Sequence, residues 1–206
     1  MRKATRIAAS FLGLFAGFGG PEHGFFEIAQ GNVRPAGLLF PSMGPPCDPE
    51  TAWHACEPAM TIIPNLLVTG ILAMVVGLVT MIWSVAFAQK KYGGIVLILL
   101  SIALLLVGGG VAPPVIGIVA GAVATRINKP LTGRAGRTWA FLARLWPWPL
   151  VAFFVWSLGQ FLVGHFSNEL LQKGAALSVL LMVGLLVLSI VTARAYDASD
   201  HGQAVV

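Results

Sequence analysis

Two apolar segments joined by glycines and prolines constrain this fold more than any other feature of the sequence. The first runs over residues 94–107 and the second over residues 115–125. Between them lie Gly108-Gly109-Gly110 and Pro113-Pro114, which interrupt regular helix. Basic residues flank the pair at both ends, and they are Lys90, Lys91, Arg126 and Lys129. We interpret the stretch as a helical hairpin in a bilayer, with both of its ends on the same side.

The composition excludes a water-soluble globular protein. The chain of 206 residues is 57% hydrophobic and 10% charged, with a mean hydropathy of +0.83. Soluble domains carry about 25% charged residues, so too little polar surface remains here to cover an apolar core. A membrane-spanning helix needs about 20 apolar residues, so five or six of them fill most of the chain. The sequence predicts an all-α, polytopic membrane protein with one embedded domain over residues 1–196 and a disordered tail over 197–206.

Six apolar segments are candidates for membrane helices, over residues 7–28, 62–89, 94–107, 115–125, 150–166 and 175–191. The first could instead be a cleaved signal peptide. Gly-Gly-Pro at residues 19–21 stands where a small-residue cleavage site would be expected, which favours a retained helix. The fourth is too short to span unless its helix begins near Gly110. The alternative is five spans plus a re-entrant arm, which must pack against protein.

The distribution of basic residues favours six spans with both termini in the cytoplasm. In that topology every Lys and Arg except Arg34 and Lys173 lies inside, which is 11 of 13. This matches the positive-inside rule, and the bias nearly vanishes if the hairpin is a single broken span. The net charge of +5 therefore indicates membrane sidedness, with the lipid bilayer rather than nucleic acid as the partner. We expect a multi-pass protein of a cell membrane, and the absence of an Asn-x-Ser/Thr sequon fits a prokaryotic cytoplasmic membrane.

Two extramembrane loops have distinct compositions. The outer loop, residues 31–61, is rich in Pro and Gly and contains Cys47 and Cys56. An oxidising exterior favours a disulfide between them, whereas a metal or redox pair with His54 has unusual spacing. The cytoplasmic loop, residues 126–146, is basic, and its aromatic and leucine residues alternate with arginines at helical spacing. That pattern is typical of a short helix lying in the membrane interface.

Three pairs of His and Glu residues are predicted on the outer side. They are His23 with Glu27, His54 with Glu57, and His165 with Glu169. Their spacings of three or four residues allow each pair to share a helical face, and imidazole with carboxylate can bind a divalent metal. The alternative is that they are hydrated groups at helix ends, where such pairs contribute little. A divalent metal is the only cofactor that the sequence suggests.

Small and polar residues within the spans predict contacts between helices. Small residues four apart let helix backbones approach closely, and they are Gly13, Gly17, Ala73, Gly77, Gly117 and Gly121. These contacts can be internal or can form a homodimer. Asn65 and Gln160 are the intramembrane polar residues whose burial without a partner would cost most, so we expect both to form hydrogen bonds between helices.

Three functional hypotheses remain open. The first is a non-catalytic membrane protein that assembles with a membrane-protein partner or with itself. The second is a small transporter or channel that uses the broken hairpin at residues 108–114. The third is a membrane metalloprotein or metalloenzyme that uses the outer His and Glu side chains. The Gly-x-Ser-x-Gly and His-Glu-x-x-His motifs are absent from the sequence, which disfavours hydrolases built on either.

Overall fold

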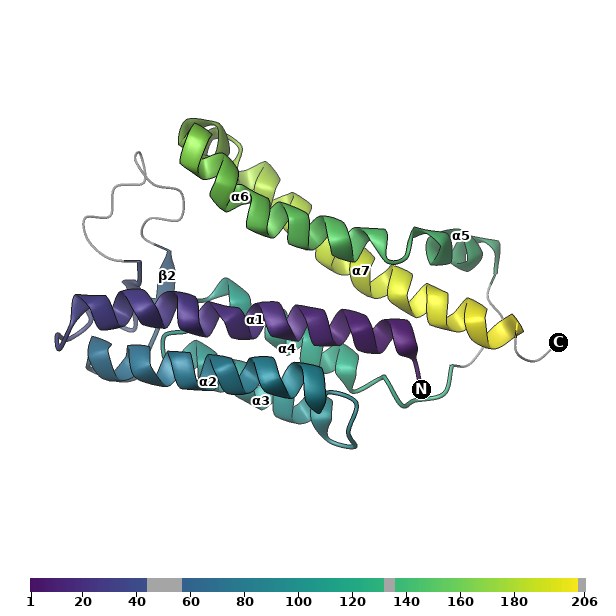
Figure 1. The fold of residues 1–206 in the computed structure, drawn as a ribbon, viewed down its shortest axis with the longest axis horizontal. Helices are drawn as coiled ribbons and strands as arrows, with labels where there is room; N and C mark the ends of the chain where they lie inside the picture. The colour runs from purple at the N-terminus through teal and green to yellow at the C-terminus, as the bar shows by residue number, and fades with distance from the viewer. Residues whose placement is uncertain (44–56, 132–135, 204–206) are drawn as a thin grey trace. The chain divides into compact units, whose positions relative to one another are not determined.

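The computed structural model describes residues 1–43, 57–131 and 136–203, with side chains through residue 199. Within these residues the chain forms seven α-helices and one two-stranded sheet (Figure 1), which confirms the all-α class. Three helices are long and apolar enough to cross a membrane. They are α2 (Leu66–Ala86), α6 (Trp148–Lys173), and α7 (Ala175–Gln203) over its residues 175–199. The predicted membrane location is therefore supported.

The pattern of buried and exposed side chains in α2 is the reverse of that in a water-soluble protein. Its buried positions are small or hydroxylated residues, among them Thr69, Ala73 and Ser84. Its exposed positions are large and apolar, among them Val75 and Ile82. The buried hydroxyls of Thr80 and Ser84 donate to carbonyls of their own helix, so they need no water. This helix has the surface expected of one that faces lipid.

The chain divides into two compact units, whereas the sequence predicts one embedded domain. The N-terminal unit holds most of α1 (Lys3–Gln30), together with α2, α3 (Gly93–Leu106) and α4 (Ala112–Ala124). The C-terminal unit holds residues 1–8 with α5 (Arg137–Leu145), α6 and α7. Helix α1 thus contributes to both units, a sharing that hydropathy does not reveal.

Glycines bring the helix backbones of the N-terminal unit into contact. A Cβ atom built on Gly77 of α2 would lie 2.6 Å from the carbonyl oxygen of Gly17 of α1. The same atom built on Gly121 of α4 would lie 2.8 Å from the carbonyl oxygen of Gly94 of α3. The other predicted small residues are also in close contact with neighbouring helices. Gly13 lies against Ser84, Ala73 against Gly20, and Gly117 against Ala16 and Ser101. All of these contacts are internal to the unit.

Helices α3 and α4 are short, and the outer loop covers the turn between them. Their 14 and 13 residues rise only about 20 Å, against a hydrocarbon core of about 30 Å. Strands β1 (Leu39–Pro41) and β2 (Pro58–Met60) pair antiparallel, with Phe40 opposite Ala59. The Gly108 amide donates to the Met60 carbonyl at 2.9 Å, and Thr61 forms a β-bridge with Val107. The loop therefore caps the helical hairpin.

A polar contact joins α6 to α7 in the C-terminal unit. The Ser178 hydroxyl donates to the Gln160 side-chain oxygen at 2.7 Å, and both residues are buried. Gln160 thus makes an interhelical hydrogen bond of the kind the sequence suggests. Helix α6 departs from helical geometry at Ser167, where φ is −149° and ψ is 57°. The predicted span over residues 150–166 ends at this kink.

The predicted disordered tail is wrong for residues 197–203, because α7 continues to Gln203. Asp197 is buried, and its carboxylate accepts hydrogen bonds from the amides of Ala4 and Thr5 at 2.9 and 2.8 Å. The Thr5 hydroxyl donates to the same carboxylate at 2.6 Å. Amides in the first turn of a helix have no acceptor within the helix itself. A carboxylate from a distant part of the chain caps them and keeps the end of α7 ordered. Residues 204–206 lie outside the described residues.

Candidate functional site

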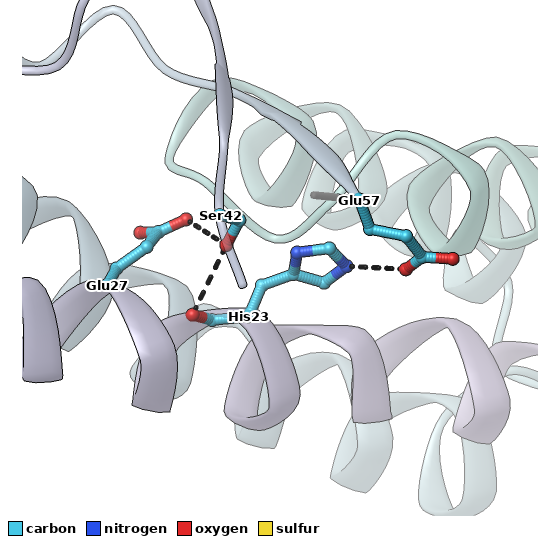
Figure 2. A network of polar contacts seen from close by, with 4 residues as sticks. All are labelled: His23, Glu27, Ser42 and Glu57. Atoms are coloured by element: carbon cyan, nitrogen blue, oxygen red, sulfur yellow. Dashed lines mark hydrogen bonds and ion pairs between the residues drawn. The ribbon is translucent and has the colours of Figure 1, made fainter. Parts of the chain in front are cut away.

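The candidate site is built around His23 and Glu27, which lie one turn apart on the same face of α1 (Figure 2). Both side chains are buried, with exposed fractions of 1% and 0%. They face the turn between α3 and α4. A Cβ atom on Gly108 would lie 2.6 Å from the Glu27 Oε1 atom, and one on Gly110 would lie 2.8 Å from the His23 Cδ2 atom. The missing side chains of this turn make room for the imidazole and the carboxyl group.

The backbone of the turn also requires glycine. Gly108 and Gly110 have φ angles of +96° and +79°, in the left-handed region that other residues adopt at a cost. The glycines predicted to break the hairpin therefore form a surface without side chains, against which His23 and Glu27 pack.

Ser42 connects the outer loop to these two residues. Its hydroxyl lies 3.1 Å from Glu27 Oε1 and 3.4 Å from the His23 carbonyl oxygen, and it can donate to either (Figure 2). The Ser42 carbonyl accepts a 2.7 Å hydrogen bond from the Gln30 amide group, and its own amide donates to the Glu57 carbonyl at 3.0 Å. Ser42 is fully buried. The hydroxyl and carbonyl groups of Ser42 thus hold the residue after β1 on α1, and its amide links it to the residue before β2.

Glu57 supplies the fourth side chain, from the residue before β2. Its Oε2 atom lies 3.6 Å from His23 Nε2, and a dashed line in Figure 2 joins these two side chains. The Glu57 side chain is about one-third exposed, whereas the His23 side chain is buried. We name His23, Glu27, Ser42 and Glu57 the outer polar cluster. It joins α1 to both strands of the outer loop.

The outer polar cluster attaches the outer loop to α1. The Ser42 hydroxyl contacts a carboxyl group and a peptide oxygen of α1, and the His23 imidazole pairs with Glu57. A buried carboxyl group is costly to leave without hydrogen bonds, and Ser42 provides one. The cluster thereby ties the loop to the bundle.

The predicted metal ligands are only partly brought together. His23, Glu27 and Glu57 meet in the outer polar cluster, where Glu57 pairs with His23. Among the residues that the structure describes, no three His, Cys, Asp or Glu side chains are grouped closely enough to hold a metal ion. His54, Cys47 and Cys56 lie outside these residues, so the disulfide stays a prediction.

His165 and Glu169 belong to the C-terminal unit and are exposed. Glu169 accepts a 2.5 Å hydrogen bond from Lys173, one helical turn further along α6. His165 stacks edge-on against Phe166. These contacts match the interpretation of this pair as hydrated groups at a helix end, where such ion pairs contribute little.

Asn65 is not within a span, because it caps the N-terminus of α2. Its side-chain oxygen accepts from the Val68 amide at 3.1 Å, and its amide group donates to Asn32. The predicted helix starts at residue 62, but Pro64 and the cap at Asn65 move its beginning to Leu66. The hydrogen bond to Asn32 links the start of α2 to the residues that follow α1. The sequence predicts a hydrogen bond between helices for Asn65, but not this partner.

Among the exposed large apolar side chains in and directly after the outer loop, three lie in the β1–β2 sheet or within two residues of it. Leu38, Leu39 and Ile62 have exposed fractions of 66%, 61% and 62%. The backbone segments that carry them are neighbours in space. The Thr61 amide donates to the Leu38 carbonyl, and Leu39 is opposite Met60 in the sheet. We name these three residues the outer apolar group. Sequence reasoning missed both this group and Ser42, since neither follows a periodic pattern in a loop rich in Pro and Gly.

Comparison with known proteins gives no assignment for this arrangement: no family model, curated protein or solved structure matches the chain.

Proposed function

We propose that this protein is a six-span, non-catalytic component of a membrane assembly, and that its outer loop binds a protein partner or a second copy of the chain. In this proposal α1, α2, α3, α4, α6 and α7 cross the membrane, and both termini are cytoplasmic. The short helices α3 and α4 then require local thinning of the bilayer. The outer loop then faces the exterior of a prokaryotic cytoplasmic membrane.

The observation that carries the proposal is the exposure of the outer apolar group beside a two-stranded sheet that is fixed in place. Burying a leucine or isoleucine side chain stabilises a complex by about 1.5–3 kcal/mol. Exposed apolar residues that lie close together often mark interaction surfaces. Here Ser42, Gln30 and the two strands hold the loop against α1 and the α3–α4 turn. A fixed loop loses little conformational entropy on binding.

The topology is supported by the structure of α1 and of the helical hairpin. Helix α1 is continuous from Lys3 to Gln30, and its first turn is capped by Asp197. That contact favours a retained first helix over a cleaved signal peptide. The α3–α4 hairpin returns the chain to the side from which it came, as the count of basic residues requires.

Photo-crosslinking in the native membrane tests the proposed function. We expect p-benzoylphenylalanine at Leu38 to form a crosslink to protein on irradiation, visible as a band of higher mass. A band at twice the chain mass indicates self-assembly, and another mass indicates a partner. The matched control is the same residue at Ile82, which is equally exposed on the lipid-facing side of α2. Crosslinks at neither position, or equally at both, would contradict the proposal.

A second candidate function is transport through the break in the α3–α4 hairpin. The observation in its favour is that two buried ionisable side chains, His23 and Glu27, face that break. Ionisable groups at membrane depth frequently mark ion pathways. Proteoliposomes with an internal pH indicator measure this directly. Proton flux above that of empty vesicles, lost in Glu27→Gln, would support transport, and the absence of flux from the wild-type protein would exclude proton transport.

A further inference from the structure

One face of α5 combines two arginines with an exposed aromatic ring. Arg137, Phe141 and Arg144 follow one another at intervals of four and three residues, so they share a face of the helix. All three are exposed, and Phe141 has an exposed fraction of 62%. An apolar ring between two charges is unfavourable in water but suits a boundary between headgroups and acyl chains.

The opposite face of α5 is occupied, which fixes the orientation of the helix. Ala143 is buried, and Trp139, Leu142 and Leu145 are half-buried. The Arg194 guanidinium of α7 lies 5.7 Å from the centre of the Trp139 ring, a cation–π contact. The arginine face therefore cannot turn inward without loss of these contacts.

Among the residues whose side chains are described, none supplies a counter-charge to this face. Residues 126–146 contain five basic residues and no acidic residue. The carboxylate of Asp197, on the nearby end of α7, is buried and accepts hydrogen bonds from Ala4 and Thr5. Of the ion pairs formed by described residues, none includes Arg137 or Arg144. An anionic ligand from outside the chain would balance these two charges.

The position of α5 along the chain indicates how deep its exposed face lies in the membrane. Only Trp146 and Pro147 separate α5 from α6, which is long and apolar enough to span a membrane. Trp148, at the first residue of α6, has an exposed fraction of 68%. Tryptophan side chains collect at the level of lipid headgroups. The face formed by Arg137, Phe141 and Arg144 thus lies at the end of a membrane helix, where phosphate groups are found.

The geometry points to a binding site for an anionic glycerophospholipid on this face of α5. The two guanidinium groups donate to the headgroup phosphate, which suits their planar geometry. The Phe141 ring packs against the glycerol and upper acyl region. This inference goes beyond the proposed function. It requires the membrane location alone, so it can stand or fall independently of the outer loop.

Native mass spectrometry of the full-length protein tests the site. The detergent-purified protein is mixed with equal amounts of phosphatidylglycerol and phosphatidylcholine that carry the same acyl chains. We expect the wild type to retain phosphatidylglycerol preferentially. Each basic side chain near an anionic surface contributes about a fivefold preference. Arg137→Gln should therefore lower the ratio about fivefold, and Arg137→Gln/Arg144→Gln should lower it about 25-fold.

Matched variants separate lipid binding from general damage. Arg137→Lys/Arg144→Lys keeps both charges and should retain most of the preference. Lys173→Gln removes a charge that already pairs with Glu169, and should leave the ratio unchanged. Phe141→Ser should lower retention of both lipids, because its apolar contact does not depend on the headgroup.

Three outcomes would overturn the inference. The first is equal retention of the two lipids by the wild type. The second is an unchanged ratio in the double glutamine variant. The third is complete displacement of phosphatidylglycerol by an equal concentration of inorganic phosphate, which would show that the face binds free anions rather than lipid.

Discussion

Gly110 illustrates how a single residue can matter in a protein that consists mostly of apolar helices. Its φ of +79° and its contact with the His23 ring both depend on the absence of a side chain. Gly108 has the same relation to Glu27. The turn and the buried pair on α1 therefore constrain each other. A change on either side should weaken the attachment of the outer loop.

We predict that Gly110→Ala lowers the stability of the protein. A left-handed backbone costs an alanine about 1–2 kcal/mol, and the new methyl group would also collide with the His23 imidazole. The midpoint of thermal unfolding in detergent, followed by intrinsic fluorescence, should fall.

Gly159→Ala is the matched control for this prediction. Gly159 lies within α6, and a Cβ atom there meets nothing within 4 Å. Alanine favours a helix over glycine by up to about 1 kcal/mol, so the midpoint should stay or rise. An equal fall in both variants would show that the turn is not specifically constrained.

At the scale of elements, the sequence predicts the helices that coincide with long apolar segments. Helix α2 lies within its predicted apolar segment, α6 contains its own and extends beyond both ends, and the break at residues 108–114 separates α3 from α4. Hydropathy does not predict the β1–β2 pairing or the extension of α7 to Gln203. Those features depend on contacts between residues far apart in the chain. The charged end of α7 has the composition of a tail, but its residue Asp197 contacts the first turn of α1.

Asp197→Ala should therefore destabilise the start of α1. Loss of a carboxylate cap typically costs about 1–2 kcal/mol, and here two amides and one hydroxyl lose their acceptor. Hydrogen exchange at the amides of Ala4 and Thr5 should accelerate, and the thermal midpoint should fall. Glu169→Ala removes an exposed partner of Lys173 and is the control, with an expected change below about 1 kcal/mol. Unchanged exchange in Asp197→Ala would show that the cap is not needed.

For the whole molecule, the candidate site was partly predictable. The i, i+4 spacing of His23 and Glu27 places them on one face of a helix, as the structure shows. The sequence could not predict that Ser42 would join them, because no local pattern indicates how an irregular loop packs. Nor could it predict the pairing of His23 with Glu57, since each faces its partner only after the loop has folded onto α1.

The proposed sidedness links the two ends of the protein. It places the outer polar cluster and the outer apolar group on the exterior. It places α5 and the basic residues around it on the cytoplasmic side. The protein would then contact a partner through its outer loop and anionic lipid through α5, on opposite surfaces of one membrane.

Cysteine accessibility in intact cells tests the proposed sides of the outer loop and of α5 most directly. In a background that carries Cys47→Ser and Cys56→Ser, single cysteines replace Leu38 and Phe141, both of which are well exposed. We predict that a membrane-impermeant maleimide labels the cysteine at position 38 in intact cells. It should label the cysteine at position 141 only after the membrane is permeabilised. Labelling of both positions in intact cells, or of position 141 alone, would contradict the topology on which this account rests.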